Sequence, residues 1–169
     1  MEIPEELKLP LKKALSRAEY GDMTVGEMRR YLTDPRRKNT GFAPEIADRV
    51  IDLLKNEGVL DDKRVLKNLV KRLDQKHFGP RRIRQELTRR LFAPAYVEAA
   101  LARNVDYGAR ADRFLADMPR AAEIAADPAG RKKLADRLIR AGFDSATSYA
   151  AVKRLSRADD DYPVGEAPN

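Results

Sequence analysis

The sequence predicts an all-α protein built from three tandem copies of one three-helix module. The tripeptide Phe-Ala-Pro occurs at residues 42–44 and again at 92–94, and a related Phe-Asp-Ser follows at 143–145. Each copy opens an apolar stretch with helical spacing, and no segment shows the period-two alternation of a half-buried strand. A repeat of about fifty residues is typical of stacked supersecondary units rather than of one globular core.

The first module is expected over residues 8–58. Thr24 and Glu27 have the spacing of a capping box at the start of a helix. Pro44 fits the first turn of a later helix, where its missing N–H costs nothing, and Gly58 ends that helix. Between them, one continuous apolar face is formed by Ile46, Ala47, Val50, Ile51 and Leu54.

A five-residue insertion distinguishes the first module from the other two. Leu32 lies ten residues before the Phe of its module, whereas Leu87 and Leu138 lie five residues before theirs. The inserted loop includes residues 34–38, Asp-Pro-Arg-Arg-Lys, which combine a turn signal with a basic tip.

The second module is expected over residues 59–105 and the third over residues 106–157. Asp61 is expected to cap a helix whose buried stripe contains Val65, Leu66, Leu69, Val70 and Leu73. Pro94 fits the first turn of the last helix of the second module. In the third module, residues 110–129 could form one helix or two.

Positive charge is concentrated in the middle of the chain. The net charge is +7, and residues 60–92 contain eleven Lys or Arg against four Asp or Glu. Residues 158–169 are rich in Asp, Pro and Gly and are expected to form a disordered acidic tail. This distribution indicates an acidic partner, either a nucleic acid or an acidic protein surface. The simpler alternative is a well-hydrated helical protein.

The residue types argue against an enzyme, a metal protein and a membrane protein. There is no Cys, the single His77 has no spaced set of carboxylates, and Asp61 next to Asp62 fits a helix cap better than a metal pair. No P-loop pattern occurs, and no cofactor is expected. The chain lacks a spanning apolar run and a secretory apolar region, so a cytoplasmic location is expected. A monomer is expected because each module is able to close its own apolar faces.

The middle of the chain contains two specific motifs. Residues 58–64 read Gly-Val-Leu-Asp-Asp-Lys-Arg, and residues 79–87 read Gly-Pro-Arg-Arg-Ile-Arg-Gln-Glu-Leu. Together these motifs resemble the RecX family of RecA regulators. Residues 14–32 and 131–143 are similar to the first and third modules of that family. The resemblance therefore covers residues 11–157.

The resemblance implies an elongated, curved array of three-helix repeats that binds RecA filaments. It also implies inhibition of recombination and of ATPase activity, and contact with DNA. Three features depart from the family pattern: the inserted basic loop, the acidic tail, and Leu91 before Phe92, where a glycine is usual.

Candidate partner-binding residues lie on two expected helices and in the inserted loop. On the helix that begins at Pro80, Ile83, Leu87 and Leu91 face the core, so the arginines face outward. Two arginines occupy its first turn, where the helix dipole disfavours cations, and this choice indicates a function. The candidates are Arg64, Lys67 and Lys71 on the first helix, Arg81, Arg82, Arg84, Gln85, Arg89 and Arg90 on the second, and Arg36, Arg37 and Lys38 in the loop.

Two hypotheses for binding remain open from the sequence. The first is a protein-binding regulator of the RecA filament, and the second is a helical protein that binds DNA non-specifically through its phosphates. Sequence-specific readout is disfavoured, because the helix starts at residues 43–45 and 93–95 offer Ala, Pro and Glu, which are poor readers of base edges. A solvated basic face is the structural alternative for each set of candidates.

Overall fold

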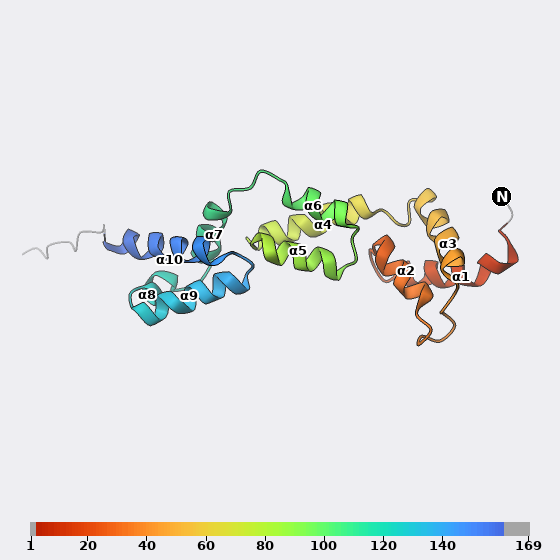
Figure 1. Ribbon diagram of the computed structural model, residues 1–169, viewed down its shortest axis with the longest axis horizontal. Coiled ribbons are helices and arrows are strands. Elements are labelled where there is room, and N and C mark those ends of the chain that lie inside the picture. Colours follow the sequence, from red (N-terminus) through yellow and green to blue (C-terminus); the bar gives the residue numbers. More distant parts are fainter. Residues whose placement is uncertain (1–2, 161–169) are drawn as a thin grey trace, which may run out of the picture. The chain divides into compact units, whose positions relative to one another are not determined.

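The computed structural model describes residues 3–160, and its regular secondary structure within that range is entirely helical, which confirms the predicted all-α class (Figure 1). The helices are α1 (Glu5–Ala18), α2 (Val25–Thr33), α3 (Pro44–Asn56), α4 (Asp62–Gln75), α5 (Pro80–Arg89), α6 (Pro94–Leu101), α7 (Tyr107–Ala116), α8 (Ala121–Ala125), α9 (Pro128–Arg140) and α10 (Ser145–Asp160).

The described residues form two compact units. Unit 1 holds residues 3–70 and 86–100, and unit 2 holds residues 71–85 and 101–160. Helices α4, α5 and α6 therefore contribute residues to both units. The division of the chain into three repeated modules stays a prediction.

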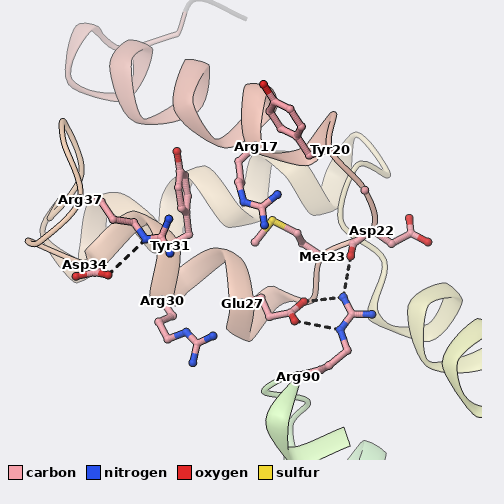
Figure 2. A pocket seen from close by; sticks show the side chains of 11 residues that line it. Arg17, Tyr20, Asp22, Met23, Glu27, Arg30, Tyr31, Asp34, Arg37 and Arg90 are labelled. Atoms are coloured by element: carbon pink, nitrogen blue, oxygen red, sulfur yellow. Dashed lines mark hydrogen bonds and ion pairs between the residues drawn. The ribbon is translucent and has the colours of Figure 1, made fainter. Parts of the chain in front are cut away.

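The start of α2 is fixed by the predicted capping box. Thr24 Oγ1 accepts a hydrogen bond from the Glu27 N–H at 3.0 Å, and Glu27 Oε2 accepts one from the Thr24 N–H at 2.9 Å. Figure 2 shows the Glu27 carboxylate at this helix start, directed toward Arg90. Two N–H groups that would otherwise lack partners are satisfied in this way.

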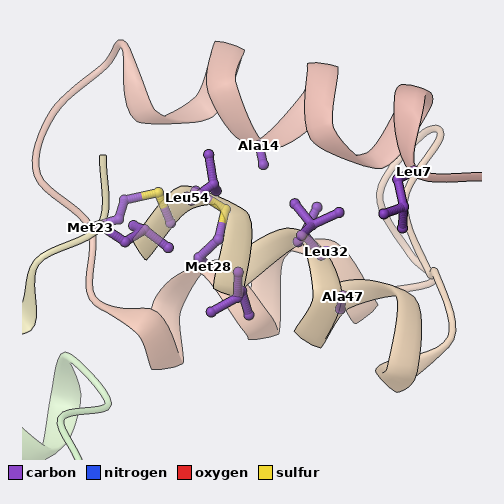
Figure 3. Packing of buried hydrophobic residues seen from close by; sticks show 10 residues of the cluster. Leu7, Ala14, Met23, Met28, Leu32, Ala47 and Leu54 are labelled. Atoms are coloured by element: carbon purple, nitrogen blue, oxygen red, sulfur yellow. The ribbon is translucent and has the colours of Figure 1, made fainter. Parts of the chain in front are cut away.

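The core of unit 1 lies between α1, α2 and α3. Figure 3 shows Leu7 and Ala14 of α1 directed toward the buried side chains of the other two helices, among them Met28, Leu32, Ala47 and Leu54. The apolar spacing predicted for α3 is confirmed, because Ala47, Val50, Ile51 and Leu54 are buried there.

The predicted boundaries of α3 are also confirmed. The helix begins at Pro44 and ends at Asn56. Beyond it, Gly58 has a φ of +68° and donates its N–H to the Lys55 carbonyl at 3.0 Å. The inserted loop before α3 closes on α2, because the N–H groups of Gly41 and Phe42 both donate to the Leu32 carbonyl, at 2.9 and 3.0 Å.

The core of unit 2 surrounds Phe143, whose side chain is completely buried. Its ring meets Phe114 of α7 edge to face at a centroid distance of 6.3 Å. The segment 110–129 contains the end of α7, the short α8 and the start of α9, and so divides at more than one point. Asp106 and Asp127 cap α7 and α9, because their carboxylates accept N–H groups from Ala109 and Gly130.

The C-terminal helix is longer than the predicted module boundary at residue 157. Helix α10 runs to Asp160, so its backbone pairing continues into the segment expected to be a disordered tail. The rest of that segment, residues 161–169, lies outside the described residues.

In both units, the N-terminus of one helix docks against the turn that precedes a repeated Phe. In unit 2 the Gly79 N–H donates to the Ala141 carbonyl at 2.9 Å, and the Arg81 N–H donates to the Gly142 carbonyl at 3.0 Å. In unit 1 the Thr24 hydroxyl donates to the Arg90 carbonyl at 2.6 Å.

Both docking turns use the left-handed backbone region. Gly142 has a φ of +100°, and Leu91 occupies the corresponding position with a φ of +55°. The glycine expected before Phe92 is thus replaced by a residue that pays the steric penalty of this conformation, about 1–2 kcal/mol. A Cβ at Gly142 would lie 2.5 Å from Arg82 Cβ, so this turn admits no larger residue without movement.

Replacement of Gly142 by Ala is expected to destabilise the protein by about 2–4 kcal/mol, since backbone strain and a steric clash add together. Gly58→Ala is the matched control. Gly58 also has positive φ, but a Cβ there would meet no atom within 4 Å. Only the conformational cost of about 1–2 kcal/mol should then remain. Urea denaturation followed by circular dichroism measures both variants, and equal losses would contradict the docking argument.

Candidate functional site

Helix α4 presents the three cations predicted from its spacing. Asp61 caps the helix as predicted, because its carboxylate accepts the Arg64 N–H at 3.0 Å. Arg64, Lys67 and Lys71 are exposed. The Arg64 guanidinium lies 3.4 Å from an Asp22 carboxylate oxygen, an exposed pair that contributes little to stability. These side chains thus remain accessible to a partner.

Helix α5 begins at Pro80 as predicted, and Ile83 and Leu87 are completely buried. Leu91, however, lies beyond the end of the helix at Arg89, so it does not extend the helical stripe. The exposed candidates are Arg81, Arg84, Gln85 and Arg89.

Arg82, in the first turn of α5, has local partners that the sequence analysis did not identify. The Arg82 guanidinium lies over the Phe78 ring at 5.7 Å from its centroid and donates to Gln85 Oε1 at 3.3 Å. Hydrogen bonds from Thr147 to the Asp144 carboxylate lower the pKa of that group. The positive charge of Arg81 lowers it further, so Arg81 interacts favourably with Asp144. These contacts offset part of the unfavourable dipole interaction, so the first-turn position alone is weaker evidence of function than expected.

Arg90 has a structural role that the sequence analysis did not foresee. Its Nη2 lies 2.7 Å from Glu27 Oε2 and also donates to the Asp22 carbonyl at 2.7 Å (Figure 2). Both side chains of the Arg90–Glu27 pair are about four-fifths buried. The binding of a partner by Arg90 stays a prediction, and inside unit 1 its guanidinium is engaged with Glu27 and the Asp22 carbonyl.

The electrostatics of this pair follow from burial and hydrogen bonding. Burial raises the pKa of the Glu27 carboxyl, but the hydrogen bonds from Arg90 and Thr24 outweigh it and hold the pKa below its ordinary value. Nearby Asp62, which accepts the Val25 N–H at 2.8 Å, behaves in the opposite way. There burial dominates and raises the pKa of the carboxyl.

The inserted loop exposes Arg36, Arg37 and Lys38. Asp34 organises the loop, since its carboxylate accepts the Arg36 N–H at 3.1 Å and lies 3.4 Å from the Arg37 guanidinium. The backbone hydrogen bond from Arg36 lowers the pKa of Asp34. Arg37 also lies over the Tyr31 ring, 5.7 Å from its centroid, which holds the loop against α2.

A polar cavity of about 210 Å³ in unit 1 brings two of the predicted candidates together. Figure 2 shows Arg37 from the inserted loop and Arg90 from the end of α5 on its walls, with Arg17 of α1 and Arg30 of α2. The sequence analysis missed Arg17 and Arg30. They are distant in sequence from each other and from the basic segment, so only the fold of unit 1 reveals the cluster.

Unit 2 carries a second set of cations that the sequence analysis missed. Lys133, Arg137 and Arg140 of α9 line a cavity of about 570 Å³, whose walls also include Met118 and Ile124. Their i, i+4 and i+7 spacing is nearly that of the three cations on α4. The signal was therefore present in the sequence, although positive charge is more concentrated in residues 60–92.

An ion cluster in unit 2 is partly buried and connects separate segments of the chain. The Asp74 carboxylate accepts hydrogen bonds from Arg103 Nη1 at 2.7 Å and from Arg110 Nη2 at 2.8 Å. Burial opposes the charge of Asp74, but these two arginines hold its pKa below the ordinary value. The cluster ties the segment between α6 and α7 to the end of α4.

The single histidine and the acidic side chains of residues 3–160 do not form a metal site. His77 Nε2 lies 3.4 Å from Asp117 Oδ2, and within this range no three His, Cys, Asp or Glu side chains are grouped as a metal site would require. None of the helices described is both long and apolar enough to cross a membrane. The features that remain as candidates are cationic binding surfaces.

Comparison with known proteins points to one group of relatives. No model of a protein family matches the chain. Regulatory protein RecX of Pseudomonas savastanoi pv. phaseolicola is 32% identical over 101 residues, which are 60% of this chain and 60% of that protein. Regulatory protein RecX of Pseudomonas putida is 30% identical over 111 residues, which are 65% of this chain and 72% of that protein.

A crystal structure of regulatory protein RecX is similar to this chain in fold, with a TM-score of 0.66 at 17% sequence identity. The superposition covers 91% of this chain and 79% of that one. At this identity the likeness shows a shared fold and does not carry over individual contacts.

Replacement of Glu27 by Gln is expected to lower the free energy of unfolding at pH 7 by about 1–3 kcal/mol, because Arg90 loses its charged partner while the capping oxygen remains. The pKa of Glu27 is lowered in the folded protein. The stabilisation is therefore complete above the ordinary glutamate pKa of about 4.3 and is lost as the pH falls through the lowered value. The difference between wild type and variant should shrink below about pH 4, as urea denaturation at several pH values will measure.

Glu123→Gln is the control, because it removes the charge from an exposed pair with Arg120. It should change stability by no more than about 0.5 kcal/mol at either pH. A Glu27→Gln effect that is equally small, or that does not depend on pH, would contradict the assigned ion pair.

Proposed function

Because the chain belongs to the RecX family, we propose that it is a non-catalytic regulator that binds the RecA recombinase filament. In this proposal it inhibits or modulates the ATPase, strand-exchange and coprotease activities of RecA, and so acts in DNA repair, recombination and the SOS response. It works as a monomer in the cytoplasm and needs no cofactor.

The exposed cations of α4 and α5 are the observation that carries the proposal. Lys71 and Arg81 are both exposed, and each is mounted on a helix whose opposite face is buried. A helix held by its core presents such side chains with little freedom of the backbone. Arginine can also form paired hydrogen bonds with a carboxylate, a geometry that suits an acidic protein surface.

Non-specific DNA binding is the alternative for the same cations. Phosphates attract these side chains without any requirement for sequence, and the affinity then falls steeply with salt. The exposed α9 residues Lys133, Arg137 and Arg140 would add to such binding. The two functions differ in whether RecA itself is needed.

Wild-type protein is expected to inhibit the ATPase of RecA on single-stranded DNA at concentrations too low to coat the DNA. Lys71→Glu with Arg81→Glu should raise the concentration needed for half inhibition by about tenfold, since charge-assisted contacts are replaced by repulsion. The control pair is Lys153→Glu with Arg157→Glu, which changes the net charge equally at exposed positions of α10.

The control pair should inhibit almost as well as wild type. Circular dichroism checks that both variants are folded. An unchanged RecA ATPase beside direct DNA binding with a steep salt dependence would refute the proposed function and favour the alternative. Equal inhibition by both variants would remove the α4 and α5 cations from the binding surface.

A further inference from the structure

The cavity of unit 1 contains two arginines whose charge is not neutralised by the described structure. Arg37 is paired with Asp34, and Arg90 is paired with Glu27. Among residues 3–160, no side-chain hydrogen bond or ion pair is made by Arg17 or Arg30, although both line the same cavity (Figure 2).

Helix dipoles explain only part of this arrangement. Arg17 lies in the last turn of α1 and Arg30 in the last turn of α2, where a cation is favourable. The dipole effect is satisfied by a cation on any side of the helix end. It does not explain why the two cations line one cavity.

The carboxylates around the cavity limit the kind of anion that fits. Asp22, Glu27 and Asp34 also line it, each already paired with an arginine. Because these carboxylates are paired, only the charges of Arg17 and Arg30 remain for a ligand, which suits one anionic group better than the many phosphates of a nucleic-acid backbone. A single carboxylate meets the two unneutralised arginines and brings no further negative charge.

The rim has the residue types of a protein interface. Tyr20 lines the cavity, and 82% of its surface is exposed. Tyr31 lines it too, with the Arg37 guanidinium over its ring. Tyr and Arg are enriched among the residues that dominate binding energy between proteins.

We propose that this cavity receives an aspartate or glutamate side chain from a protein partner. Arg17 and Arg30 donate hydrogen bonds to the carboxylate, and Tyr20 packs against neighbouring atoms of the partner. The inserted loop supplies one wall through Asp34 and Arg37. The inference rests on the proposed function, in which the protein partner is the RecA filament.

The test compares Arg17→Glu with Arg30→Glu against the control pair Lys153→Glu with Arg157→Glu. Binding of the full chain is measured to RecA filaments assembled on single-stranded DNA with a slowly hydrolysed ATP analogue. Binding to a fluorescent oligothymidylate without RecA is measured in parallel. The cavity variant should lose filament affinity by about tenfold or more, whereas its oligothymidylate affinity should match that of the control pair.

Arg17→Gln with Arg30→Gln guards against a folding defect, because it removes the charges without adding repulsion. It should show a smaller loss in the same direction, with an unchanged circular dichroism spectrum and melting temperature.

Each of the other outcomes would overturn a specific part of the proposal. Filament affinity equal to that of the control pair would overturn the cavity as a binding site and leave the proposed function intact. A parallel loss of oligothymidylate affinity would mean that the cavity holds a phosphate, which overturns the assigned carboxylate. Failure of the wild-type protein to bind filaments would overturn the proposed function and this inference with it.

Discussion

Backbone docking between a helix N-terminus and a tight turn is the constraint on which the cationic helix α5 depends. The helix starts Gly-Pro-Arg, and neither Gly79 nor Pro80 has a side chain that can cap it. The carbonyls of Ala141 and Gly142 accept the N–H groups of Gly79 and Arg81 instead. Since buried N–H groups need partners, the turn between α9 and α10 takes over the work of a capping residue. The first-turn arginines are therefore held by a contact more than fifty residues away in sequence.

Unit 1 solves the same problem with side chains. Thr24 and Glu27 cap α2 within the helix, and both also reach the turn at Arg90. One consequence is that the Arg90 guanidinium makes contacts that hold unit 1 together. Another is that the charge of Glu27 affects both of its charged neighbours. It raises the pKa of Arg90 and contributes to the raised pKa of Asp62. The ion pair is more than a cap, because removal of either charge leaves the other poorly solvated.

Local patterns predicted the elements well, because their causes are local. The capping box at Thr24, the cap at Asp61 and the prolines that open α3, α5 and α6 were all legible in the sequence. The exposure of the α4 cations followed from helical periodicity in the same way. Tertiary partners were not legible, since nothing near Arg90 in the sequence indicates Glu27, which lies 63 residues before it. The cavity arginines were missed for the same reason, since a cavity has no sequence period.

The five-residue insertion in the first expected module lies beside the cavity that contains Arg17 and Arg30. In the second and third expected modules, the leucine lies only five positions before the phenylalanine, which leaves no room for a loop that could fold over a helix. The insertion adds Asp34 and Arg37, and the contact of Arg37 with Tyr31 turns the loop back onto α2 beside Arg30. Asp34 is then occupied by its own loop arginines, so it does not neutralise Arg17 or Arg30. The inserted loop therefore closes one side of the cavity without neutralising it. Arg17 and Arg30 remain for an anion from outside, and this pattern of pairing gives the proposed protein interface its chemical specificity.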